Sequence, residues 1–102
     1  MFYDMLHSIG YLTEQLQNNK QLLKSRHYEK IGTALQLLQK IEMIDAQSEL
    51  NAIYEIVDSL LESDDCDSKC AIFKNEIFGV KDLLTSVCAE IEQDPQFVAG
   101  PM

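Results

Sequence analysis

Apolar residues recur at intervals of three and four along most of this chain, which is the period of an amphipathic helix. No stretch alternates strictly between apolar and polar residues, as a half-buried strand does, and β-branched residues are sparse. Nothing in the pattern therefore favours a sheet. The sequence predicts an all-α protein.

The periodic residues fall into four stretches, and each stretch predicts one helix. In chain order the stretches are Phe2, Met5, Ile9, Leu12, Leu16, Asn19 and Leu23; Tyr28, Ile31, Leu35, Leu38 and Ile41; Leu50, Ile53, Val57 and Leu60; and Phe73, Ile77, Val80, Leu84, Val87 and Ile91. The letters KSRH end the first stretch, and Pro95 marks the end of the fourth, because the residue before a proline disfavours helix. Residues 95–102 are expected to form an irregular tail.

The second and third stretches have no Gly or Pro between them, so the phase of their apolar residues decides whether they form one helix. At about 100° per residue, Leu50 lies roughly 120° around the helix axis from Leu38. Asp45 and Ser48 also offer N-caps for a new helix. We therefore expect a break, and with it two helical hairpins that close into an antiparallel four-helix bundle with longer outer helices. Three helices with a long continuous middle helix are the alternative.

The size and composition of the chain fit one globular domain spanning residues 1–102, with 46% hydrophobic and 25% charged residues. No apolar run approaches the ~20 residues that cross a bilayer, and the first residues carry an acid where a signal peptide carries Lys or Arg. The odd number of cysteines, three, argues against a disulfide framework. We expect a soluble cytoplasmic protein with reduced thiols and no membrane contact.

The charge is concentrated in the second half of the chain. Residues 45–102 carry thirteen Asp or Glu and three Lys, whereas residues 1–44 are nearly balanced, and the net charge of the chain is −9. Such an acidic half repels nucleic acid and anionic lipid, and favours basic partners.

The most unusual local stretch, LLESDDCDSKCAIF at residues 60–73, places four acidic side chains and two cysteines between apolar runs. An EF-hand loop that began at Asp65 would have Lys69 at a ligand position and Cys70 where the turn needs Gly, which argues against a calcium site. We expect a solvated loop and a helix start capped by Asp67 or Ser68, with Cys70 as a semi-buried apolar residue.

Zinc and redox chemistry are also disfavoured in this stretch. Cys66 and Cys70 form one pair, but Cys88 lies about 27 Å from Cys70 along the same helix, and His7 and His27 would each have to arrive alone. Neighbouring aspartates disfavour a thiolate, which a redox switch requires.

No catalytic constellation is present. The chain lacks the phosphate-binding, dinucleotide-binding, metalloprotease and nucleophile-elbow motifs, and it lacks the paired Glu-x-x-His of di-iron bundles. His7 lies opposite the seam of the first helix and His27 in a turn, so both are expected at the surface. We expect no enzyme activity, no cofactor and no metal ion. The small basic corner of Lys20, Lys24, Arg26 and Lys30 is expected to be solvated, without direct nucleic-acid binding.

Several apolar residues lie away from the predicted seams and are candidates for contact with a partner. The six are Tyr11, Leu22, Leu37, Ile41, Ile44 and Phe78. Leu37 and Ile44 lie roughly 110–130° from the centre of the second seam, so that helix is apolar over more than half its circumference. The alternative is that the second helix is simply the most central one.

A stripe of carboxylates on the third helix and the loop after it is the second candidate surface. It comprises Glu55, Asp58, Glu62, Asp64 and Asp65. Most stripes of this kind are only solvated, but regularly spaced carboxylates on a rigid helix could imitate a phosphate backbone.

Three functions remain to be compared. The first is a non-enzymatic protein of adaptor, chaperone, immunity or inhibitor type that binds another protein, with a basic partner or a homodimer as possibilities. The second is a nucleic-acid mimic that inhibits a DNA- or RNA-binding protein through the acidic stripe. The third, a metal-dependent or redox enzyme, has the weakest support.

Overall fold

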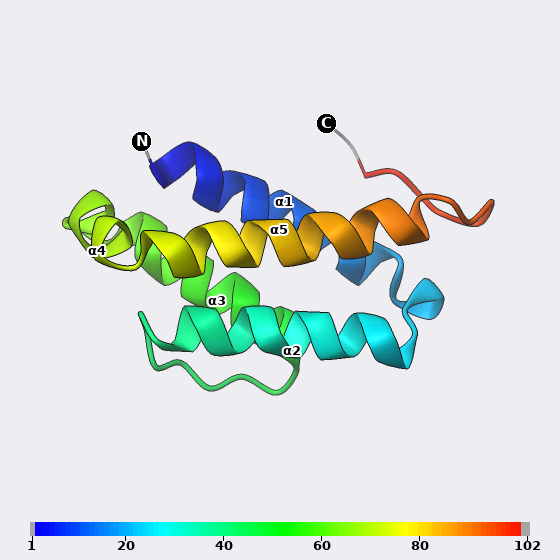
Figure 1. Cartoon of the computed structure of the whole chain (residues 1–102), viewed down its shortest axis with the longest axis horizontal. Helices are drawn as coiled ribbons and strands as arrows, with labels where there is room; N and C mark the ends of the chain where they lie inside the picture. The colour runs from blue at the N-terminus through cyan, green and yellow to red at the C-terminus, as the bar shows by residue number, and fades with distance from the viewer. Residues whose placement is uncertain (1, 101–102) are drawn as a thin grey trace.

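The computed structural model describes residues 2–100, and those residues form five α-helices, one short 3-10 helix and no strand. In chain order they are α1 (Phe2–Asn18), the 3-10 helix η1 (Lys20–Leu22), α2 (Ser25–Gln39), α3 (Glu49–Glu62), α4 (Cys66–Ile72) and α5 (Lys74–Ile91) (Figure 1). The predicted all-α class is confirmed. The predicted count of four helices is not, because α4 is an additional short helix.

The break between the second and third predicted helices is confirmed, and the continuous middle helix is wrong. Helix α2 ends at Gln39 and α3 begins at Glu49. Ser48 caps the new helix, with its side-chain oxygen accepting a hydrogen bond of 3.2 Å from the backbone N–H of Asn51. We call the connecting residues 40–48 the crossover, because they run back along the molecule before α3 begins (Figure 1).

Helix α4 forms where the sequence predicts a solvated loop followed by a helix start. Cys66 and Cys70 are one turn apart and both are buried, so a single helical turn brings both thiols to the core. Phe73 separates α4 from α5, because its backbone (φ −109°, ψ 32°) departs from the helical region. Asp65 is the N-cap residue of α4, and Asp67 instead accepts a 3.1 Å hydrogen bond from the backbone N–H of Phe2. The predicted cap at Asp67 or Ser68 is therefore wrong.

The long helices do not pack as two separate hairpins. Helix α2 packs against α5 and α3, while α1 packs against α3, α5 and α4. The closest neighbours therefore come from different predicted hairpins. Figure 1 shows α1 running parallel to α5, and α2 parallel to α3, because the crossover runs back toward the end where α2 began.

The core lies between these helices and contains most of the predicted seam residues. Ile9, Leu16, Ile31, Leu38 and Ile53 are completely buried. The radius of gyration of 13.1 Å is that of a compact domain of about 100 residues. None of the described helices combines the length and the apolar character that a membrane span requires.

Candidate functional site

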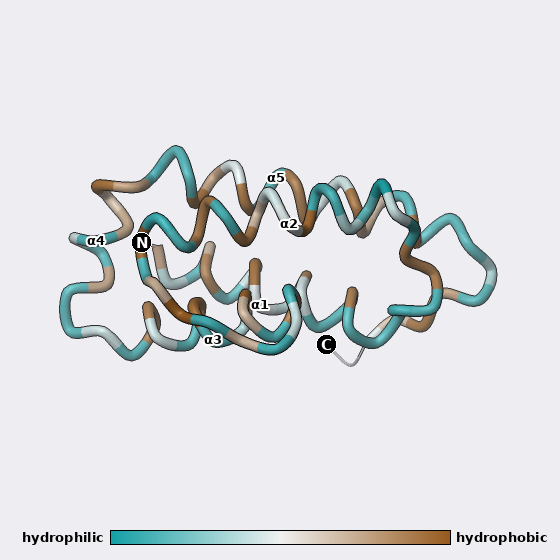
Figure 2. The backbone as a smooth tube through the Cα atoms, turned by 90° about the horizontal axis from the view of Figure 1, so that it is seen from below, coloured by the Kyte–Doolittle hydropathy of each residue, from teal (hydrophilic) through white to brown (hydrophobic). Residues whose placement is uncertain are grey.

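Among the described residues, the two most exposed large apolar side chains lie at the end of the molecule that carries α4. We call this end the α4 end. Met43 in the crossover is 86% exposed, and Ile72 at the last position of α4 is 76% exposed. Figure 2 shows hydrophobic residues of the crossover and of α4 at this same end. Side chains of this size are normally buried, so this degree of exposure singles out the α4 end among the described residues.

An ion pair joins the crossover to α4. Lys69 Nζ lies 2.6 Å from Glu42 Oε1, and this hydrogen bond, together with the charge of Glu42, raises the pKa of Lys69. Met43 directly follows Glu42, and Ile72 lies one turn after Lys69 on the same side of α4. The ion pair therefore holds the segments that carry the two exposed side chains.

Three of the predicted contact residues belong to this region but are only half-buried. Leu37, Ile41 and Ile44 all pack against the core. Leu37 covers Gly79 of α5 so closely that a Cβ built on that glycine would lie 3.2 Å from its Cδ1. Much of the additional apolar surface of α2 is therefore used in contact with α5. The end of α2 and the crossover form the border of the α4 end, and Met43 and Ile72 form its exposed part.

The other three predicted contact residues lie elsewhere. Tyr11 is 39% exposed and Phe78 is 45% exposed, whereas Leu22 is half-buried in η1 against the core. Tyr11 borders a shallow groove of about 440 Å³ between α1 and α5, which also includes His7 and Lys81. The six predicted contact residues therefore do not form one surface.

The acidic stripe is exposed along its whole length. Its five members, Glu55, Asp58, Glu62, Asp64 and Asp65, all face solvent on α3 and in the turn that follows it. A hydrogen bond from Ser63 holds the pKa of Asp65 below its usual range. Nearby, burial and the charges of Glu14 and Asp58 raise the pKa of Tyr54 to about 12. Asp65 therefore stays charged and Tyr54 stays neutral through the physiological pH range.

The three cysteines are buried free thiols. Burial and the neighbouring Cys66 raise the pKa of Cys70 to about 12, and burial and the charge of Glu92 raise that of Cys88 to about 12. A thiol must ionise to act as a nucleophile or a metal ligand, so these environments oppose both roles. Within residues 2–100, no three His, Cys, Asp or Glu side chains lie where they could share a metal ion.

The main polar cluster lies at the opposite end of the molecule and contains a residue that the sequence misplaces. His27 is predicted at the surface in a turn, but it lies in the first turn of α2 and only 2% of it is exposed. Its Nδ1 accepts a 3.0 Å hydrogen bond from the backbone N–H of Lys24, which caps the helix. The residue types at this helix start do not follow the usual capping pattern, so the burial of His27 could not be predicted from them.

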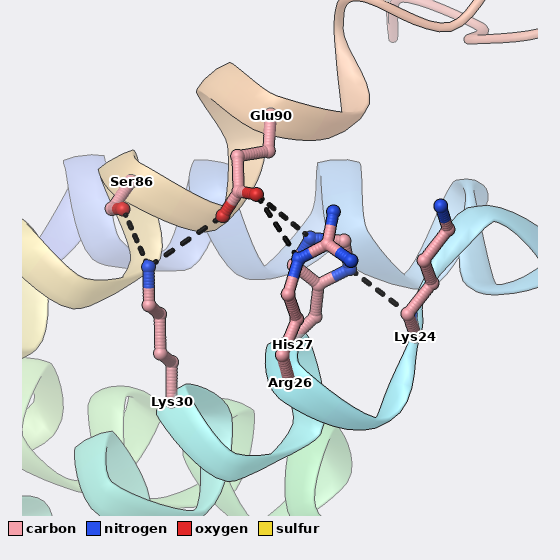
Figure 3. A network of polar contacts seen from close by, with 6 residues as sticks. All are labelled: Lys24, Arg26, His27, Lys30, Ser86 and Glu90. Atoms are coloured by element: carbon pink, nitrogen blue, oxygen red, sulfur yellow. Dashed lines mark hydrogen bonds and ion pairs between the residues drawn. The ribbon is translucent and has the colours of Figure 1, made fainter.

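Glu90 of α5 is the centre of that cluster (Figure 3). Its carboxylate lies 3.2 Å from Arg26 Nε, 3.5 Å from Lys30 Nζ and 3.6 Å from His27 Nε2. Lys30 also donates a 3.0 Å hydrogen bond to the hydroxyl of Ser86. Two of the four residues of the predicted basic corner, Arg26 and Lys30, are thus used in contacts between α2 and α5.

Comparison with models of known protein families, with curated proteins and with solved structures found no match for this chain.

Proposed function

We propose that this protein is not an enzyme and acts by binding another protein at the α4 end. The observation that carries the proposal is the exposure of Met43 and Ile72 beside the Glu42–Lys69 ion pair. Burying one such side chain contributes about 1.5–3 kcal/mol. Two of them on adjoining segments could supply the central contacts of an interface, where a few residues provide most of the affinity.

In this account the four long helices act as a bundle that carries α4 and the crossover at one end. The ion pair between Glu42 and Lys69 limits the motion of both segments, so less conformational entropy is lost when a partner binds. The half-buried border residues Ile41 and Ile44 extend the apolar surface toward the core.

The charge around the α4 end indicates which partner fits. Residues 42–76 carry ten Asp or Glu and two Lys, and one of these lysines, Lys69, is already paired with Glu42. Asp64, Asp65 and Asp67 are exposed beside α4. A basic, amphipathic segment of another protein would match both the apolar centre and the acidic rim. A second copy of this chain would bring two acidic ends together, which disfavours a homodimer at this surface.

Shift mapping with a defined probe tests the proposal. A short amphipathic helical peptide made only of Leu and Lys is titrated into the isotopically labelled protein. We expect the largest amide shift changes at Met43 and Ile72, and a moderate weakening when the salt concentration is raised.

Other shift patterns would overturn the proposal. Changes confined to Glu55, Asp58 and Glu62, with binding that disappears in salt, would support the nucleic-acid mimic instead. A doubled mass of the free protein in light scattering, lost in a Met43→Ser/Ile72→Ser variant, would identify a second copy as the occupant.

A further inference from the structure

The segment Phe97–Gly100 folds back from the end of α5 onto the end of α1 (Figure 1). The backbone of Val98 forms two hydrogen bonds with one side chain, since its N–H donates to Asn19 Oδ1 at 2.8 Å and its carbonyl accepts from Asn19 Nδ2 at 3.0 Å. The N–H of Gly100 donates to Gln15 Oε1 at 3.0 Å. These bonds recognise the backbone of the segment and none of its side chains.

The side chains of Gln15 and Asn19 are both buried. Asn19 is completely buried and Gln15 is 4% exposed. Asn19 Nδ2 also donates to the backbone carbonyl of Gln15 at 2.9 Å, which fixes the orientation of its amide. The bonds are part of a prearranged surface.

The spacing of these amides fits an extended chain. Gln15 lies in the last turn of α1 and Asn19 directly follows the helix, so four residues at the helical rise separate them by about 6 Å. Alternate residues of an extended strand are separated by about 6.6 Å. Residues 98 and 100 can therefore bond to the two amides in register.

The resident segment leaves one buried hydrogen-bond donor of this site without an acceptor. Gln15 Nε2 is buried and has no hydrogen-bond partner among the described atoms. A Cβ on Gly100 would lie 2.3 Å from that nitrogen, so only a residue without a side chain fits there unless Gln15 moves. Phe97, one residue before the amide contacts begin, packs half-buried against the core. A buried donor without an acceptor costs free energy, which leaves room for a ligand that supplies a carbonyl.

We propose that Gln15 and Asn19 form a second protein-binding site, which takes an extended peptide with the pattern aromatic, any residue, any residue, glycine. In the free protein the site is occupied by Phe97–Gly100 of the same chain. A segment of this class from another protein displaces it and presents a carbonyl to Gln15 Nε2. This site is independent of the α4 end and lies at the other end of the molecule.

The test uses the full chain and an acetylated, amidated peptide with the sequence of residues 94–100. Val98→Pro removes the N–H that donates to Asn19, and so weakens the resident segment without changing the site. A tethered segment competes at an effective concentration in the millimolar range, so we expect Val98→Pro to bind the peptide at least about tenfold more tightly than the wild-type chain. Ala99→Pro is the matched control and should behave like the wild type, because no described atom accepts the Ala99 N–H.

Two altered peptides test the register. N-methylation of the valine amide should weaken binding by about tenfold, because it removes one buried hydrogen bond, whereas N-methylation of the alanine amide should not. Replacement of the glycine by alanine should also weaken binding. The side-chain amide signals of Asn19 and Gln15 report the contact directly.

Several outcomes would overturn the proposal. If Val98→Pro does not bind the peptide, or if both N-methylated peptides bind equally, the contact is only a fixed tether. A doubled mass of the wild-type chain in light scattering, lost when excess peptide is added, would show that the occupant is the segment of a second copy.

Discussion

The hydrophobic core is covered in different ways at the two ends of this molecule. At the end formed by the last turn of α1 and the first turn of α2, polar side chains and the segment Phe97–Gly100 cover the core, with Asn19 and His27 buried beneath. At the α4 end helix α4 covers the core through Cys66 and Cys70, but Met43 and Ile72 project into solvent. We call the first the closed end, whereas the α4 end carries the two most exposed large apolar side chains of the described residues.

The difference shows how similar apolar patterns can have different consequences. Leu37 extends the apolar surface of α2, but it is used internally against Gly79. Met43 and Ile72 have no such neighbour to cover them, although the ion pair between Glu42 and Lys69 fixes their segments. The proposed interaction surface is therefore supported by exposure on a fixed segment and not by hydrophobicity alone.

Of the polar contacts at the closed end, those of Asn19 are expected to have the largest effect on stability. Asn19→Ala removes hydrogen bonds to Val98 and to the backbone of Gln15 and leaves buried groups unpaired, so the free energy of unfolding should fall by about 2 kcal/mol. The neighbouring Asn18→Ala is the control, because Asn18 is exposed, and should change stability by less than about 0.5 kcal/mol. Urea unfolding measures both, and equal effects would show that the buried amide does not hold the closed end.

A smaller loss is expected from His27. His27→Phe keeps the ring in the core but removes the Nδ1 that accepts from the Lys24 N–H, so the free energy of unfolding should fall by about 1 kcal/mol. His7→Phe is the matched control at an exposed position and should have little effect. If thermal or urea unfolding does not distinguish the two variants, the cap does not contribute to stability.

The carboxylate of Glu90 should make the free energy of unfolding depend on pH. Loss of hydration alone would raise the pKa of Glu90, but the hydrogen bond from Arg26 and the charge of Lys30 hold it below the usual value of 4.5. Its stabilising contribution is therefore complete above about pH 4.5 and is lost as the pH falls through the lower folded-state pKa. Urea midpoints of the wild type and Glu90→Gln should differ most near neutral pH and converge in acid. A constant difference across that range would contradict this role of the carboxylate.

The smallest effect on stability is expected from the exposed side chains at the α4 end. Met43→Ser/Ile72→Ser removes side chains that are 86% and 76% exposed, so the free energy of unfolding should change by no more than about 0.5 kcal/mol per site. Ile77→Ala provides the contrast, because Ile77 is completely buried and its loss should cost about 2–5 kcal/mol. A large loss in the double variant would mean that the two side chains are structural.

The sequence predicted much of the fold because helical periodicity reports directly on burial. The break before Ser48 followed from the phase of Leu38 and Leu50. Helix α4 was missed because its seven residues have only two buried positions, Cys66 and Cys70, and are too short to show a period. The neighbours of each helix could not be predicted, since the path of the crossover depends on contacts between distant residues.

The candidate site was predicted only in part, for a related reason. Leu37, Ile41 and Ile44 were predicted to contact a partner and lie half-buried beside the proposed site, but a helical wheel cannot show that Leu37 faces Gly79. Met43 and Ile72 were not predicted as contact residues because each lies outside the predicted seams. Their exposure depends on how the crossover and α4 pack in the folded protein. Asn19 appeared as a polar interruption in the first seam, and its bonds to Val98 give the reason.

The most direct test of the central claim compares two double variants by titration calorimetry with the Leu/Lys helical peptide. Met43→Ser/Ile72→Ser removes the apolar centre of the α4 end, and Glu55→Gln/Asp58→Asn removes two charges from the acidic stripe. We predict that the first variant weakens peptide binding by more than about tenfold and the second by only a fewfold, because apolar burial at the centre contributes more than rim charge. Unchanged affinity in the first variant, with a large loss in the second, would contradict the account.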